Sequence, residues 1–181
     1  APKAFSMWRL APLVSRYLSG TCASGLHEAR LGRECYGGEV HVFSAGYTEG
    51  DLKEILDIAD HVVFNSCGQW RRFRPLALEA KTRRPGLKFG LRINPEHSEG
   101  HIPIYDACAP GSRLGIPLSQ LDESELEHIS GLHFHTLCEQ DFPPLQRTLQ
   151  AVEQRFGHLL GSLQWVNFGG GHHITLPDYQ R

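Results

Sequence analysis

The sequence predicts an α/β fold and, within that class, an incomplete (β/α)8 TIM barrel with about seven of its eight units. Short β-branched or aromatic runs alternate with amphipathic stretches, which is typical of parallel strands joined by helices. The alternation continues evenly over seven units, and this favours a barrel over a Rossmann-type sheet. The chain has 181 residues, whereas a complete barrel needs roughly 250.

Each predicted strand is a short apolar segment that stands beside turn residues or a helical pattern. The intervening helices have periodic apolar positions. In one of them Leu145, Leu149, Val152 and Phe156 recur every three or four residues, as one buried helix face requires. The predicted strands lie around Lys3 and at 21–24, 40–44, 61–65, 89–93, 132–136 and 165–168.

Local signals predict where the helices begin and end. Thr48 with Asp51, and Ser66 with Gln69, have the spacing of capping boxes, in which a side chain bonds the free N–H groups of the first turn. Gly157 stands where a glycine that ends a helix is expected.

Composition excludes several classes of protein. The chain is 40 % hydrophobic and 21 % charged with a net charge of -2, so a basic face for nucleic acid is not expected. No apolar run approaches the roughly 20 residues of a membrane helix. The cysteines are irregularly spaced without a C-x-x-C pair, which predicts reduced thiols in the cytoplasm. They are Cys22, Cys35, Cys67, Cys108 and Cys138.

Polar residues gather at the predicted strand ends, where barrel enzymes carry their chemistry. Gly169, Gly170 and Gly171 follow the last strand, where backbone N–H groups can approach an anion closely. Late strands of this fold often precede a phosphate site. The glycines therefore predict phosphate binding, with a simple tight turn as the alternative.

Two histidines stand two positions apart on the sixth predicted strand. His133 and His135 would point to the same face, into the barrel. With His172 and His173 nearby, a zinc site is an alternative interpretation. We expect no metal, because Glu139 is the sole acidic residue at ligand spacing and an inward histidine can instead lie flat against an aromatic ring.

Three further side chains allow more than one interpretation. Lys3 on the first predicted strand would suit Schiff-base chemistry if it points inward, but it could also be an exposed terminal lysine. Arg92 can hold an anion or form a salt bridge. Cys138 could act as a nucleophile beside His135, although most single cysteines are small core residues.

Seven segments in order carry a resemblance to a known family: "KAFSMW", "CASGLHEARLG", "DHVVFNS", "LRINPE", "YDACAPGSRLG", "GLHFHTLCEQ" and "NFGGGHHIT". They resemble the carboxynorspermidine (carboxyspermidine) decarboxylases, which depend on pyridoxal 5'-phosphate (PLP) and have the alanine racemase type of barrel, fold type III. The resemblance covers essentially the whole chain.

The resemblance implies roles for the residues at the strand ends. Lys3 corresponds to the lysine that binds PLP covalently, and His135 to the histidine stacked on its ring. Gly169, Gly170 and Gly171 correspond to the phosphate-binding turn. Arg92 and Cys138 are expected to contact the cofactor, and Glu139 and His173 the substrate.

The implied reaction is decarboxylation of carboxynorspermidine or carboxyspermidine to norspermidine or spermidine, by a cytoplasmic homodimer with shared active sites. The chain would be a partial PLP-binding barrel domain over residues 1–181. The C-terminal β-domain of the family is expected outside it, so the fragment alone should be inactive. Alternatives are another decarboxylase of this fold, such as one that acts on diaminopimelate, or a single-barrel PLP-binding protein without catalysis.

Overall fold

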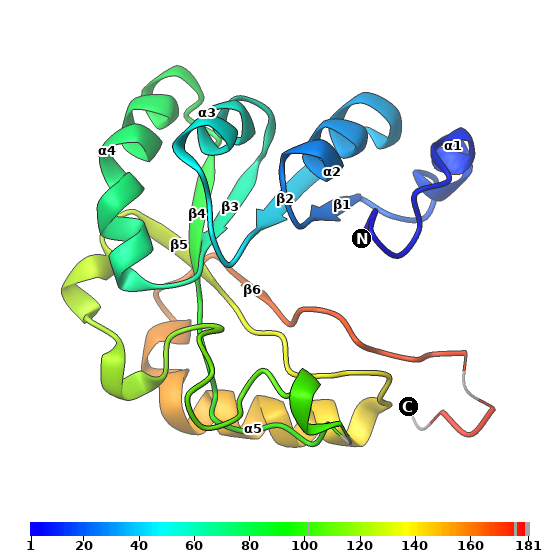
Figure 1. The fold of residues 1–181 in the computed structure, drawn as a ribbon, viewed down its shortest axis with the longest axis vertical. Coiled ribbons are helices and arrows are strands. Elements are labelled where there is room, and N and C mark those ends of the chain that lie inside the picture. The colour runs from blue at the N-terminus through cyan, green and yellow to red at the C-terminus, as the bar shows by residue number, and fades with distance from the viewer. Residues whose placement is uncertain (101, 176, 180–181) are drawn as a thin grey trace.

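The computed structural model describes residues 1–100, 102–175 and 177–179. They contain one parallel sheet of six strands whose order in space follows their order in the chain. The sheet is curved into half of a barrel, with helices around its outer side and an open inner side (Figure 1). The strands are β1 (Gly20–Ala23), β2 (Glu39–Phe43), β3 (His61–Phe64), β4 (Lys88–Arg92), β5 (Ile129–His133) and β6 (Trp165–Asn167).

Most crossovers between the strands contain a helix. A short α1 (Ala11–Val14) precedes β1, and α2 (Leu26–Leu31) runs directly into a π-helix at Gly32–Tyr36. The longer helices are α3 (Glu49–Ile58), α4 (Cys67–Arg83) and α5 (Phe142–Leu160). Between β4 and β5 the chain forms only short 3-10 helices, at Pro103–Tyr105, Leu118–Gln120 and Glu123–Leu126.

The alternation of side chains along each strand separates a core from the inner face. Val40 and Val42 of β2 are fully buried, and so are Phe64, Phe89 and Leu132 of the neighbouring strands, in one core with helix residues. Intervening positions carry a polar set that faces the open side, because neighbours on a strand point to opposite faces. This second set contains His41, His61, Arg92, His133 and Asn167.

The predicted helix starts are confirmed, and one predicted helix end is wrong. Thr48 Oγ1 accepts from the N–H of Asp51 at 3.1 Å, and Ser66 Oγ from that of Gln69 at 3.0 Å. Gly157 does not end α5, which continues to Leu160. Leu159 is buried, so the apolar face extends past Gly157 and packing holds the last turn in place.

The prediction of a strand around Lys3 is wrong, and the described residues therefore contain six strands where the sequence predicted seven. Residues 2–4 form a turn, in which the carbonyl of Ala1 accepts from the N–H groups of Ala4 and Phe5. Pro2 has no N–H to donate to a strand ladder. The turn therefore uses backbone N–H and carbonyl groups that a strand would need for its ladder.

The sequence predicted no membrane helix and reduced cysteines. Among the described ranges, none of the helices combines the length and apolar character that crossing a membrane requires. All five cysteines are free thiols.

Candidate functional site

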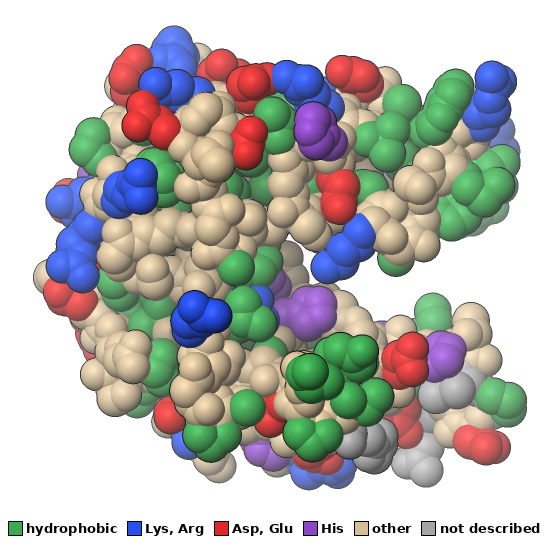
Figure 2. Space-filling view, in the orientation of Figure 1, with side chains coloured by type: hydrophobic (Ala, Val, Ile, Leu, Met, Phe, Trp, Pro, Cys, Tyr) green, Lys and Arg blue, Asp and Glu red, His purple; other side chains and the backbone are tan. Residues whose placement is uncertain are grey.

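A cavity of about 220 Å³ opens on the inner side of the sheet, at the carboxyl ends of β1, β2, β5 and β6. Figure 2 shows the molecule hollowed on this open side, with basic and histidine side chains at the mouth of the hollow. Lys3, His135, Gly169 and Gly170 all line the cavity, and among the described residues no aspartate or glutamate does so. The cavity therefore suits an anionic ligand.

Lys3 reaches the cavity from the N-terminal turn. Its side chain is exposed, which agrees with the alternative of an exposed lysine, and it does not lie on a strand as the sequence predicted. Among the residues that the structure describes, it forms no salt bridge. Its charge helps to lower the pKa of His135, so the two groups are near each other. The amine is free to react with a ligand in the cavity.

The two histidines of "GLHFHT" lie at the end of β5. His133 is the last strand residue and His135 stands two positions later, with the ring centroids 6.3 Å apart. Burial lowers the pKa of His133 to about 3, with further contributions from Arg92, His135 and His41. Burial also lowers the pKa of His135, helped by the charges of Arg92 and Lys3. Both rings are thus neutral at pH 7.

Arg92, the last residue of β4, is a buried cation without an acidic partner among the described residues. Its Nη2 donates to the carbonyl oxygen of His135 at 3.2 Å, and its guanidinium lies 4.7 Å from the centroid of the Phe43 ring. Its Nε is buried and unpaired. Burial lowers its pKa to about 10, so it stays charged at pH 7 and can attract an anion.

The three positions after β6 differ in how strictly the backbone requires glycine. Gly169 and Gly171 have φ of 75° and 91°, which favours glycine. A Cβ on Gly171 would lie 2.1 Å from the carbonyl oxygen of Leu137, whereas one on Gly170 would meet nothing closer than 3.7 Å. Close contacts with the neighbouring backbone therefore explain glycine at positions 169 and 171, whereas a side chain at position 170 would only touch the ring of His135.

The glycine turn carries unused donors. Asn167 Oδ1 accepts from the N–H of Gly169 at 2.8 Å, and so fixes the start of the turn. Within the described part of the chain, the N–H groups of Gly170, Gly171 and His172 donate no hydrogen bond. Successive free N–H groups form a concave anion site. Sequence reasoning missed Asn167, although an asparagine two residues before a glycine is typical of such a turn.

The other predicted site residues lie outside this cavity. Cys138 is exposed and, with Glu139, lines a second, smaller cavity beside Thr136. Glu139 has φ of 52° and also borders a groove that contains Glu99 and Asp141. His173 is half-buried, and its N–H donates to the carbonyl of Gln140 at 3.0 Å. The structure does not bring these three together with Lys3.

Comparison with curated proteins finds relatives that are named as decarboxylases. No family model matches the chain. It is 40 % identical over 179 residues to a carboxyaminopropylagmatine decarboxylase of Synechocystis sp., and 38 % identical over 179 residues to a carboxynorspermidine/carboxyspermidine decarboxylase of Campylobacter jejuni. Each match covers 99 % of this chain and 45 % of the relative. The chain thus spans less than half the length of these curated relatives.

Solved structures that match the chain are also decarboxylases. A carboxynorspermidine decarboxylase from Campylobacter jejuni, complexed with norspermidine, matches with a TM-score of 0.82 at 36 % identity, over 97 % of this chain and 43 % of its own. A diaminopimelate decarboxylase from Helicobacter pylori, complexed with L-lysine, matches with a TM-score of 0.70 at 16 % identity, over 93 % of this chain and 47 % of its own. The second match shows a shared fold alone.

Proposed function

We propose that this chain, a homologue of the carboxynorspermidine/carboxyspermidine decarboxylases, is the PLP-binding barrel part of a cytoplasmic enzyme that decarboxylates a carboxylated polyamine. One observation supports this most strongly. Lys3, His135 and the glycine turn, which come from distant parts of the sequence, line one cavity that lacks acidic residues. Lysine, a flat neutral ring and free backbone N–H groups are the donor set that a phosphorylated aromatic aldehyde requires.

The residues present fit PLP. The amine of Lys3 would attach it covalently, and the ring of His135 would lie against its ring without bringing a positive charge. The free N–H groups of Gly170, Gly171 and His172 would hold the phosphate. Arg92, which has an unpaired Nε, would supply positive charge behind His135. When bound, the cofactor acts as an electron sink for the carbanion that decarboxylation leaves.

The chain's own residues contribute positioning and electrostatics. Phe43 and Arg92 pack at 4.7 Å and fix the cation beside the His135 backbone. The closely packed turn at Gly171 holds the phosphate-binding N–H groups in a single arrangement. Preorganised donors of this kind stabilise charge without reorganisation during the reaction. Cys138 follows His135 by three residues in the same loop. We further propose that this loop brings Cys138 to the bound cofactor.

Acidic side chains in a separate groove suit a polyamine tail. Glu139 and Asp141 border the groove next to α5, where Glu99 is already held by Arg147 at 2.6 Å. This leaves Glu139 and Asp141 free to attract the amines of a substrate. We propose that His173, which follows the glycine turn, also contacts the substrate. The proposed assembly is a homodimer that completes its sites with residues of both subunits.

Relative turnover tests this proposal. The intact protein, loaded with PLP, is assayed for kcat/KM with carboxynorspermidine, carboxyspermidine, carboxyaminopropylagmatine and diaminopimelate. We expect the three compounds with cationic tails to be preferred at least tenfold over diaminopimelate, whose far carboxylate Glu139 and Asp141 would repel. Equal or faster turnover of diaminopimelate would reject the substrate class, and absence of turnover with all four compounds would reject the enzyme.

A further inference from the structure

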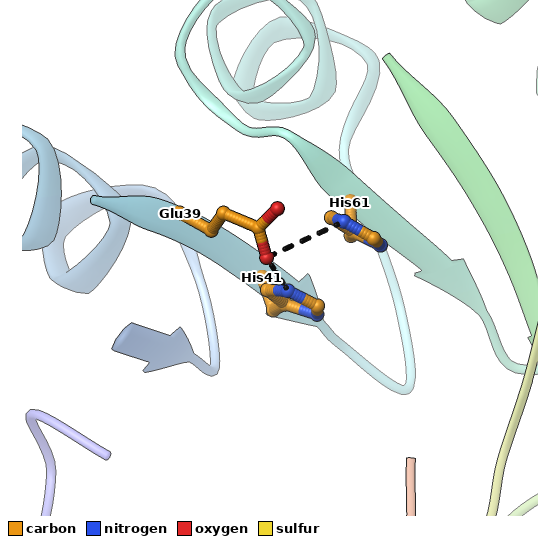
Figure 3. A group of neighbouring side chains, drawn as sticks. All are labelled: Glu39, His41 and His61. Atoms are coloured by element: carbon orange, nitrogen blue, oxygen red, sulfur yellow. Dashed lines mark hydrogen bonds and ion pairs between the residues drawn. The ribbon is translucent and has the colours of Figure 1, made fainter. Parts of the chain in front are cut away.

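Three side chains that could ligate a metal lie together on the inner face of β2 and β3 (Figure 3), and one of them, His41, also borders the cavity that contains Lys3. Glu39 and His41 are two positions apart on β2 and therefore point to the same face. His61 begins β3 and is the register partner of His41. The parallel pairing of β2 with β3 thus brings together residues that are 22 positions apart in the chain.

The ligand atoms of this cluster converge. The imidazole rings of His41 and His61 stack with centroids 3.8 Å apart and planes 11° apart. Oε2 of Glu39 lies 3.2 Å from Nε2 of His41 and 3.8 Å from Nε2 of His61. In a tetrahedral zinc site with bonds of 2.0–2.1 Å, neighbouring ligand atoms are roughly 3.3–3.4 Å apart. The Glu39 oxygen is close to this separation from both nitrogens, but the two rings must rotate out of their stack to bind one ion, because the lone pair of each nitrogen lies in its own ring plane.

His61 is the unusual member of the cluster. It is 4 % exposed, its Nδ1 is buried without a partner, and no described residue forms a hydrogen bond with either ring nitrogen. Its Nε2 points at the Glu39 carboxylate from 3.8 Å, which is too far for a hydrogen bond. Two ligands of one ion are found at such separations. An ion held between Nε2 of His61 and the Glu39 carboxylate would give this buried imidazole a partner.

The surroundings restrict the cluster. The ring of Trp165 meets His61 edge-on at 5.1 Å and His41 at 6.2 Å, and so covers one side of the pair. Asp60 is next to His61 in sequence but is held by Arg33 at 2.5 Å and Arg84 at 3.4 Å, so it is not an available ligand. The Glu39 side chain is 58 % exposed, which leaves a coordination position open to water.

We propose that Glu39, His41 and His61 bind one Zn²⁺ ion. Two imidazoles and a carboxylate form a donor set that zinc uses in proteins, with water as the fourth ligand. The ion would connect the amino ends of β2 and β3. Glu39 and His61 are the first residues of their strands, at the end of a barrel where residues contribute to stability more than to catalysis, so the ion would have a structural role.

Zinc titration of matched variants tests the proposal. The intact protein is stripped with a chelator, and ZnCl2 binding is measured by calorimetry for the wild type, Glu39→Gln and Glu123→Gln. Glu39→Gln keeps the size and the exposed position of the side chain but removes the charge. Glu123→Gln is the control, because Glu123 forms a comparable exposed pair with His158 at 3.1 Å that has no second histidine.

We expect one high-affinity zinc equivalent in the wild type and in Glu123→Gln, and at least tenfold weaker binding in Glu39→Gln. Co²⁺ in place of zinc should give the visible absorption of a four-coordinate ion, and Glu39→Gln should lose it. Zinc bound by thiols would be equal in all three proteins. Equal binding by the wild type and Glu39→Gln, or no stoichiometric zinc in the wild type, would overturn the proposal.

Discussion

The indole of Trp165 on β6 lies directly over the backbone of Gly131 on β5. A Cβ on Gly131 would be 2.1 Å from Cδ2 of Trp165, and one on Gly90 of β4 would be 2.4 Å from Cη2 of the same ring. The indole thus covers β5 and β4 at two glycines, which have no side chain of their own. This contact fills the inside of the half-barrel, beside the stacked histidines.

Gly131→Ala should therefore destabilise the protein by about 1–3 kcal/mol, since the added methyl cannot fit without moving the indole. Gly157→Ala is the control. Gly157 lies inside α5 with nothing within 4 Å of its Cβ position, so alanine there should add roughly 0.5–1 kcal/mol of stability. Urea denaturation measures both. Equal effects of the two substitutions would contradict the packing described.

The glycine turn allows a sharper comparison. Gly171→Ala should lower both stability and PLP affinity, because φ is 91° and the methyl would meet the Leu137 carbonyl. Gly170→Ala should fold normally, because its methyl would come no closer than 3.7 Å to His135 Cε1, but it should bind PLP several-fold more weakly, since Gly170 lines the cavity. Thermal denaturation of the apoprotein and PLP titration separate the two effects. Normal PLP affinity in Gly170→Ala would argue against phosphate binding at the turn.

Arg92→Met should weaken PLP binding at least tenfold and change apoprotein stability by less than about 1 kcal/mol. The substitution removes a buried cation that no carboxylate balances, so the lost hydrogen bond to His135 is offset by the lost cost of burying the charge. Fluorescence titration with PLP and urea denaturation measure the two quantities. A large loss of stability with unchanged PLP affinity would show that Arg92 is purely structural.

The low pKa of His133 predicts that apoprotein stability depends on pH. The folded pKa is about 3 and the ordinary value is 6.5, so between these values the unfolded state binds a proton that the folded state does not. Stability should fall as pH falls from 6.5 toward 3, by at most roughly 1.4 kcal/mol per pH unit from this group. His133→Asn should flatten this dependence, and His158→Asn on the exposed face of α5 should not. A parallel pH profile in His133→Asn would contradict the assignment.

Most of the fold followed from local sequence pattern. Six of the seven predicted strands exist, because alternating or continuous apolar residues between turn signals depend only on nearby residues. The strand predicted at 132–136 is shifted, since β5 is Ile129–His133 and His135 lies beyond its end. The Thr48 and Ser66 caps were predictable for the same reason. Lys3 was misplaced because the apolar residues around it resemble a strand, while Pro2 and the Ala1 carbonyl favour a turn.

The candidate site was partly predictable. The carboxyl ends of parallel strands meet at one edge, so His135 and the glycine run could be expected together, and His135, Gly169 and Gly170 do line one cavity. Lys3 also lines it, although it reaches the cavity from a turn and not from the predicted strand. The roles of these residues stay predictions. The Trp165 contact with Gly131 and the pairing of His41 with His61 depend on strand register, which a single sequence does not reveal. A glutamate two positions before a histidine on β2 was the available signal for the second cluster.

Covalent attachment of the cofactor at Lys3 tests the central claim most directly. The intact protein is incubated with one equivalent of PLP, reduced with borohydride and digested, and mass spectrometry locates the modified lysine. The account predicts stoichiometric modification of Lys3. It also predicts that Lys3→Ala loses the visible absorbance of the bound cofactor, whereas Lys53→Ala, which removes the exposed partner of Glu49, keeps it. Stoichiometric modification of a different lysine, or unchanged absorbance in Lys3→Ala, would contradict the account.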